Sequence, residues 1–432
     1  MTTKLPLRAI AACLLAAPVA ACADPVLTLS TQARLRYDVY DNAQLAPGND
    51  YRQGLFRGIL GAKLLFTPSF GVYGEAGTGQ VSARRSKASA SFQNTASLQQ
   101  LYLRGCSDIA GASLGMQLGR QEFADGPRQL LSPGDGPNLH RSWNGARMAL
   151  KGQRWRVSAY ELRATRLARG AFDEDINHGE RLHGLNATLS APAAPADGYK
   201  NGKADGKPED ALGGFWIHSR NPAFRAGRSV GTDERDTLGL RLTGRSGRLK
   251  YDWTVARQSG RYMNRDVSAW GVFAVQSLAL PDYGWKPRLT SRIDVASGGG
   301  YQGGTLRGFN QLYASSAYLG EGQFLSLSNL LMVSPGLAFS PAPNTTLAVE
   351  YGFARRLRED DAAYAGGMRA YTGTQNMPGR ELGGLFRLVG TWAASEHLTF
   401  TLNVERMDAG DVLKRAKLPS ASYAYLGATI RY

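Results

Sequence analysis

Long apolar runs and cysteines are both scarce in this sequence of 432 residues. Past residue 23 no stretch holds 18 consecutive apolar residues, so no segment there is expected to cross a membrane as a helix. No long segment shows the i, i+3, i+4, i+7 spacing of an amphipathic helix either. The mean hydropathy of −0.30 resembles that of a soluble protein. A transmembrane β-barrel is just as polar, because only alternate strand residues face lipid, so the residue pattern must separate the two classes.

Groups that support catalysis or metal binding are also few. None of the five histidines has a metal-binding spacing; His178 and His183 lie five apart in a loop-like region. No serine lies in a nucleophile elbow, and the glycine-rich stretch around Gly299 lacks the strand and helix that flank a phosphate-binding loop. The acidic run 173–175 could bind a divalent cation, although an acidic loop tip is the simpler interpretation. We predict no enzymatic activity, no metal site and no cofactor.

The N-terminus has the pattern of a cleaved signal peptide. Lys4 and Arg8 form a positive region, residues 9–20 form a short apolar region, and Ala21-Cys22-Ala23 matches a cleavage site. An alternative is a lipobox at residues 19–22, which would make Cys22 a lipidated N-terminus. Either pattern directs the chain out of the cytoplasm. Cleavage would divide the sequence into a signal peptide (1–23) and a mature chain (24–432) whose only cysteine is Cys106.

The rest of the chain predicts an all-β fold. Segments of roughly ten residues alternate apolar and polar side chains and are separated by Gly, Pro, Asn and Asp. We expect about eighteen strands, in a transmembrane antiparallel β-barrel with long extracellular loops and no domain boundary. The alternative is a soluble sandwich whose charged face is solvated. The signal peptide, the 19 Tyr and 7 Trp, and the alternating last strand ending in Tyr432 favour the barrel.

Three stretches interrupt the alternation and are predicted to be extracellular loops: 191–213, 297–324 and 355–381. The first is rich in Ala, Pro, Gly and charge, and the second is rich in glycine. Loops of this length in a compact fold are commonly functional. Arg355, Arg356 and Arg358, in the third stretch, could contact lipopolysaccharide phosphates.

Positive charge is in excess, with 51 Lys and Arg against 35 Asp and Glu, a net charge of +16. An exported chain has little access to nucleic acid, so we predict no nucleic-acid partner. Arginine facing lipid at mid-membrane costs about 2–4 kcal/mol, so the charged faces should line the lumen, where rings of arginine favour anions. The alternative is a structural ladder of arginines paired with carboxylates across the lumen. The predicted substrate path comprises Arg34, Arg36, Arg104, Arg120, Arg128, Arg141, Trp143, Arg147, Arg241, Arg288, Arg292 and Arg387.

Two members of this path carry specific expectations. Arg120 follows Leu114, Met116 and Leu118 in the alternation, so it would reach the lumen only with a bulge at Gly119. Trp143, with Tyr102 and Tyr160, could offer apolar faces to sugar rings, although packing or interfacial anchoring is the simpler role for all three aromatic residues.

Several short motifs resemble, in the same order, those of the alginate export porin family of bacterial outer membranes. They are Gly119-Arg120-Gln121, Gly126-Pro127-Arg128, Arg141-Ser142-Trp143-Asn144-Gly145-Ala146-Arg147, Asp294-x-x-Ser297-Gly298, Phe309-Asn310-Gln311-Leu312-Tyr313, Ser328-Asn329-Leu330, Gly379-Arg380-Glu381-Leu382-Gly383 and Asp408-Ala409-Gly410-Asp411-x-Leu413. The turn at Ser132–Pro137 departs from the family pattern, which puts in doubt how far that loop reaches into the pore.

The resemblance implies an outer-membrane channel that exports a linear polyuronate such as alginate by passive diffusion. Its expected partners are the anionic polysaccharide, outer-membrane lipid with lipopolysaccharide, and periplasmic export components. Two other functions stay open: a general or small-carboxylate porin with the same arginine lumen, and a structural or adhesin barrel that transports nothing.

Overall fold

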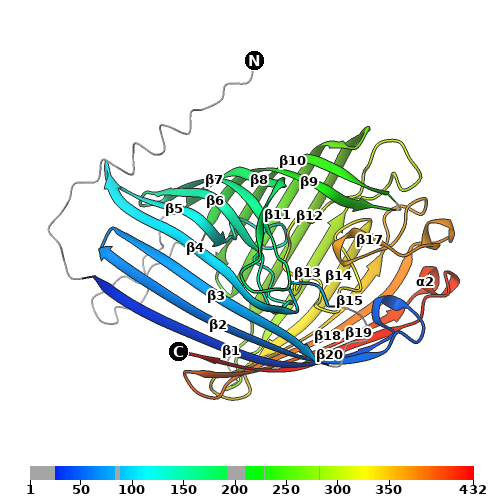
Figure 1. Ribbon diagram of the computed structural model, residues 1–432. Helices are drawn as coiled ribbons and strands as arrows, with labels where there is room; N and C mark the ends of the chain where they lie inside the picture. Colours follow the sequence, from blue (N-terminus) through cyan, green and yellow to red (C-terminus); the bar gives the residue numbers. More distant parts are fainter. Residues whose placement is uncertain (1–24, 83–87, 192–209, 228, 282) are drawn as a thin grey trace.

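The computed structural model describes residues 25–82, 88–191, 210–227, 229–281 and 283–432 (Figure 1). The predicted signal peptide and Cys22 lie outside the described residues. Eighteen long strands, nine to eighteen residues each, form one sheet. No helix in the described ranges is long and apolar enough to cross a membrane. The prediction of an all-β fold with about eighteen strands is confirmed.

The strands of the main sheet are β1 (Val26–Asp41), β2 (Tyr51–Thr67), β3 (Phe70–Ser82), β4 (Asn94–Ile109), β5 (Ala112–Glu122), β6 (Ser142–Lys151), β7 (Trp155–Arg166), β8 (Asp175–Ser190), β9 (Ala211–Ala226), β10 (Ser229–Ser246), β11 (Leu249–Tyr262), β12 (Arg265–Ala279), β13 (Arg288–Ala296), β14 (Leu330–Phe339), β15 (Thr345–Arg355), β18 (Glu381–Ala393), β19 (Leu398–Ala409) and β20 (Ala421–Arg431). The smaller elements are β16 (Tyr364–Ala365), β17 (Arg369–Ala370), η1 (Ala43–Leu45), η2 (Gly366–Met368), η3 (Thr374–Asn376) and α2 (Asp411–Arg415).

Every strand of the main sheet pairs antiparallel with its neighbours along the chain, and the last strand returns to the first. β1 pairs with β2 on one side and with β20 on the other, with Arg34 opposite both Arg57 and Thr429. This pairing closes the sheet into a barrel and leaves no exposed edge. In Figure 1 the red β20 lies beside the blue β1.

The two ends of the barrel differ. One end, here called the turn end, holds the C-terminus, the start of β1 and short connections such as 68–69 and 110–111. The other, the loop end, holds the connections 123–141, 297–329 and 356–380. The predicted extracellular loops 297–324 and 355–381 therefore coincide with loop-end connections.

The segment 191–213 was placed wrongly with them. It joins the end of β8 at Ser190 to the start of β9 at Ala211, and both residues lie at the turn end. Residues 192–209 themselves lie outside the described residues. The end of the barrel at which the segment lies depends on counting strands, and composition alone does not provide that count.

The outer wall is apolar because one side of each strand's alternation faces outward. On β10, Leu238 and Leu240 are exposed on the outside, while Arg235 and Thr237, which precede them at odd-numbered positions of the alternation, are buried inside. Trp155, Trp253, Trp285 and Trp392 lie at strand ends or turns of the turn end, with exposed rings suited to the edge of a lipid layer. The last strand follows the same rule, since Leu426 and Ile430 are exposed and Thr429 is buried.

Candidate functional site

The interior of the barrel is crossed by the loop 123–141, here called the crossing loop. Arg34 of β1 donates to the carbonyl oxygen of Pro137 at 2.8 Å, and Arg241 of β10 donates to that of Gly126 at 2.9 Å. On β7, Arg156 contacts the carboxylate of Asp125 at 3.1 Å. These donors are on the inner faces of strands from different sides of the barrel. The loop therefore spans the lumen and is held at several points on the wall.

A second inward loop, 297–329, lies against the inner faces of β13, β18 and β19. Arg387 of β18 donates to the carbonyl oxygen of Ala317 at 2.9 Å, and Arg292 of β13 donates to that of Tyr318. The carboxylate of Glu405 on β19 accepts the backbone N–H groups of residues 321 and 322 at 2.8 and 2.9 Å. Removing a fully buried carboxylate that accepts several hydrogen bonds strongly lowers the stability of a protein. Glu405 therefore fixes this part of the loop to the wall.

The two loops are joined to each other inside the barrel. Tyr313 donates its N–H to the carbonyl of Leu130 and accepts the N–H of Ser132, both at 2.9 Å. The guanidinium of Arg141 lies 5.0 Å from the centre of the Tyr313 ring and donates to the carbonyls of Ser132 and Tyr313. Burial lowers the pKa of Arg141 from its usual value. Arg141 therefore ties the two loops together.

Trp143 packs inside the barrel, which is the simpler of the roles considered from the sequence. Its side chain is 1% exposed and meets the Tyr313 ring edge-on, with ring centres 4.7 Å apart. Its indole has no face free for a sugar ring, so its placement in the substrate path was wrong. Buried leucines of the crossing loop, Leu130 and Leu131, belong to the same cluster.

Five arginines of the predicted path lie on the inner wall but are neutralised by carboxylates. Arg36 pairs with Asp38 and Glu321, Arg34 with Asp135, Arg241 with Asp252, Arg292 with Asp294 and Glu350, and Arg387 with Glu350. The nearest N–O distances in these pairs run from 2.6 to 3.4 Å. The sequence left open a structural ladder of paired arginines as the alternative to an anion-selective lumen. That ladder describes this part of the wall.

Arg120 does not face the lumen, and its placement in the path was wrong. The pairing of β4 with β5 and of β5 with β6 runs through Gly119 without a register shift. Arg120 therefore shares the outward face of its partner Leu101, and its guanidinium contacts Glu174 at 2.8 Å. The bulge that would have turned it inward is absent.

Arg356 is also not available to a lipopolysaccharide phosphate. Its side chain is buried and donates to the backbone carbonyls of Gly379, Asp361, Thr374 and Met377. It holds the loop 356–380 together. Arg358 is exposed but is paired with Asp360 at 2.7 Å.

Arg128 and Arg288, two further members of the path, have exposed side chains. Arg128 lies on the crossing loop, where its carbonyl accepts the N–H of residue 315 at 3.2 Å. Arg288 opens β13 at the turn end of the barrel. Neither forms an ion pair with another described residue, and their part in a substrate path stays a prediction.

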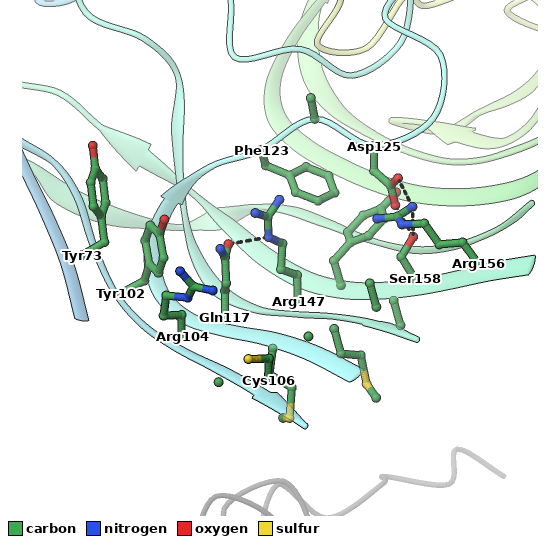
Figure 2. Close-up of a pocket in the computed structure, with 18 of the residues that line it drawn as sticks. Tyr73, Tyr102, Arg104, Cys106, Gln117, Phe123, Asp125, Arg147, Arg156 and Ser158 are labelled. Carbon is green, nitrogen blue, oxygen red and sulfur yellow. Dashed lines mark hydrogen bonds and ion pairs between the residues drawn. The ribbon is translucent and has the colours of Figure 1, made fainter. Parts of the chain in front are cut away.

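Arg104 and Arg147 line a chamber between the crossing loop and the turn end, shown in Figure 2. The chamber has a volume of about 460 Å³. Among the described residues, its charged side chains are Lys63, Arg104, Arg147 and Arg156 with a single carboxylate, Asp125. Lys63 and Arg104 form no ion pair with a described residue, and Arg147 donates to the amide oxygen of Gln117 at 2.6 Å. Positive charge in this chamber is therefore only partly neutralised.

Aromatic side chains and the cysteine complete the chamber. Tyr73, Tyr102 and Tyr160 line it together with Phe123, and the rings of Phe123 and Tyr160 are 4.5 Å apart. Tyr102 and Tyr160 therefore line the chamber, and a contact of their rings with sugar stays a prediction. Cys106 is a free thiol in the same wall (Figure 2).

A second cavity, of about 520 Å³, lies toward the loop end. Its lining comes from the crossing loop at Pro133 and Arg141, from the second inward loop at Tyr318 and Leu319, and from loop-end residues such as Gly366. The joined loops lie between the two cavities.

Asp135, at the tip of the crossing loop, is the centre of a charged cluster. Its Oδ1 lies 2.7 Å from Arg57, 3.4 Å from Arg34 and 2.8 Å from His140, and His140 also contacts Glu122 at 2.5 Å. The His140 hydrogen bond and the two guanidinium groups hold the pKa of Asp135 well below its usual range. Burial alone would lower the pKa of His140, but its two carboxylate partners raise it to about 9.

This cluster predicts that the anchoring of the crossing loop to the barrel wall depends on pH. The pKa of His140 rises from 6.5 to about 9 in the folded protein, so its stabilisation is complete below about pH 6.5 and is lost as the pH rises through 9. The loss amounts to at most roughly 3 kcal/mol. Proteolysis of the crossing loop should accelerate between pH 7 and pH 10 in the wild type. A His140→Gln variant should show no such step; a step that persists in this variant would assign it to another group.

Several residues of this region were not anticipated from the sequence. Arg57 and Lys63 lie on β2, where Phe56 and Leu60 face outward, so the alternation of residues 51–67 carried the signal for both inward cations. Asp135 and His140 gave no such signal, because their partners lie on other elements. No group of three or more metal-binding side chains occurs in the part of the chain that the structure describes.

The closed barrel with inward-folded loops defines this protein as an outer-membrane barrel of the channel-forming class. The family model for alginate export matches residues 27–426, nearly the whole chain. The chain belongs to the alginate export family. None of the curated proteins matches it in sequence.

Solved structures support the same fold. The Pseudomonas aeruginosa porin OpdK with vanillate superimposes with a TM-score of 0.62 at 11% identity, covering 94% of this chain and 98% of that chain. OccD3 (OpdP) from the same organism gives 0.61 at 11% identity, covering 94% and 91%. OccK2 (OpdF), also from Pseudomonas aeruginosa and in complex with glucuronate, gives 0.56 at 12% identity, covering 94% and 96%.

Proposed function

We propose that this protein is a passive, anion-selective channel that exports alginate or a similar polyuronate across the outer membrane. The observation that carries the proposal is the chamber at the turn end, where four cationic side chains face one carboxylate. Unpaired cations in a narrow lumen lower the energy of an anion there and raise that of a cation. In this proposal the turn end faces the periplasm, and the chamber receives the polymer.

A polyuronate fits the chamber in two respects. It carries a carboxylate on every sugar unit, and guanidinium groups such as those of Arg104 and Arg147 bind carboxylates through paired N–H donors. The rings of Tyr73 and Tyr102, 5.3 Å apart, offer apolar surface to the faces of sugar rings. Binding at one chamber followed by release past the loops is compatible with diffusion and requires no energy source. Export components on the periplasmic side are its expected partners.

A small-carboxylate porin is the second candidate, and the crossing loop favours it. The joined loops leave two separate cavities of modest volume, which suit a single carboxylate-bearing molecule better than a chain. Vanillate and glucuronate, the molecules in two of the solved porin structures, are both small carboxylates. Both candidates share anion selectivity and differ in whether the polymer enters the lumen.

Single-channel recording in a planar bilayer separates the candidates. We expect a reversal potential that shows preference for anions, and block by an oligouronate at concentrations where a neutral oligosaccharide of equal length has no effect. Anion-selective current without block would favour the small-carboxylate porin. Absence of current would contradict both, and would leave a structural barrel.

A further inference from the structure

The turn Ser132–Pro137 of the crossing loop delivers a carboxylate to the inner wall. Its sequence is Ser-Pro-Gly-Asp-Gly-Pro, and Gly134 adopts a φ of +75°, a conformation that favours glycine. Pro133 and Pro137 have fixed φ angles, so the turn loses little further chain entropy when it docks. Asp135 is the only charged residue of the turn.

The position that Asp135 occupies has the features of a carboxylate-binding site. Arg57 and His140 contact its Oδ1 at 2.7 and 2.8 Å, and Arg34 reaches the same atom at 3.4 Å. Asp135 is the only carboxylate paired with Arg57 among the described residues. The Nε atom of Arg57 is buried and has no hydrogen-bond partner there. One carboxylate therefore pairs with three cationic groups, and Arg34 and Arg57 each keep a buried Nε atom without a hydrogen-bond partner among the described residues.

Burial in this cluster is uneven. The side chain of Asp135 is 68% exposed, whereas those of Arg57 and Arg34 are 2% and 8% exposed. Asp135 thus covers the two guanidinium groups from the lumen while remaining largely exposed itself. Its removal would uncover two arginines and a histidine that point at one position, with Glu122 as the remaining carboxylate on the histidine.

We propose that Arg34, Arg57 and His140 form a binding site for a sugar carboxylate, and that Asp135 occupies this site as an internal substitute when substrate is absent. The proposal deepens and rests on the proposed anion transport. An incoming uronate would exchange one carboxylate for another on the same donors, so the charge of the buried cluster is conserved. Exchange would release the tip of the crossing loop, the element that separates the two cavities.

The test compares binding of D-glucuronate to the refolded full chain and to its Asp135→Asn variant by calorimetry in detergent micelles. The amide removes the competing charge. The backbone contacts of Arg34 with the carbonyls of residues 135 and 137 remain to hold the loop. If Asp135 fills the site nine-tenths of the time, the variant should bind glucuronate about tenfold more tightly. Asp173→Asn, a loop carboxylate that caps Gly170, is the matched control and should leave affinity unchanged.

Adding Arg57→Gln to Asp135→Asn should abolish the gain, and glucose should bind no protein measurably. Equal or weaker glucuronate binding by Asp135→Asn would overturn the proposal, as would the absence of glucuronate binding to both proteins. The outcome is independent of polymer export. A channel that oligouronate fails to block, but whose Asp135→Asn variant gains glucuronate affinity, would refute the polymer substrate and retain the carboxylate site.

Discussion

Replacing Arg104 and Arg147 together with glutamine should lower the preference of the channel for anions several-fold while leaving its conductance near the wild-type value. Both side chains line the turn-end chamber, and neither has a carboxylate partner among the described residues. At 0.1 M salt the Debye length is about 10 Å, so two charges in a chamber of this size act on every ion that passes. Neither residue holds either inward loop, so the width of the passage should not change.

Reversal potentials in a salt gradient measure this effect, and Cys106 gives a second measurement. Its thiol is in the same wall and is the only cysteine in the predicted mature chain. A positive chamber should make an anionic thiol reagent react about tenfold faster than its cationic analogue, after correction for their rates with a free thiol. The double substitution should remove most of that difference.

The control is Arg406→Gln combined with Arg415→Gln. Both arginines are paired with carboxylates, Asp408 and Asp411, and both have exposed guanidinium groups away from the chamber. The control should leave selectivity and labelling unchanged. A selectivity that survives the loss of Arg104 and Arg147 would show that the field comes from other charges, and would contradict the role of the chamber.

The barrel was predictable because its main determinant is local. Alternation of the kind seen in Leu238, Leu240 and Leu242 follows from the two-residue period of a strand, and it needs no knowledge of the neighbouring strands. The end of the barrel at which a connection lies is not a local property. It follows from counting strands along the chain, and each missed or added strand moves every later connection to the other end. The segment 191–213 was put at the wrong end for this reason.

The candidate site was predictable only in part. The inward direction of Arg147 and Arg292 followed from the alternation. Their pairing did not: Arg292 pairs with carboxylates, whereas Arg147 has no carboxylate partner among the described residues. Pairs formed within a strand, such as Arg36 with Asp38 and Arg292 with Asp294, follow an Arg-x-Asp spacing that was readable in the sequence. Pairs that depend on the inward loops, such as Arg57 with Asp135, required the fold of the loop itself.

Replacing residues 124–140 with a short Gly/Ser turn should raise the single-channel conductance several-fold. The strands that flank the crossing loop are in register at its base, where Glu122 of β5 lies opposite Ser142 of β6, so a short hairpin can close the gap without strain. The replacement removes the segment that reaches Arg34, Arg156 and Arg241 across the lumen. The barrel should persist, because its strands retain all of their backbone pairing.

The same replacement tests whether the strands set the anion preference while the crossing loop limits the conductance. It removes Asp125, the only carboxylate among the described residues that line the chamber, and leaves Lys63, Arg104, Arg147 and Arg156 on the wall. Anion preference should therefore be maintained or increased while conductance rises. An equivalent shortening of the turn-end connection 280–287 between β12 and β13 is the control and should change neither property. Unchanged conductance after removal of the crossing loop would mean that ions already pass beside it. A joint loss of selectivity would place the anion preference in the loop instead of on the strands.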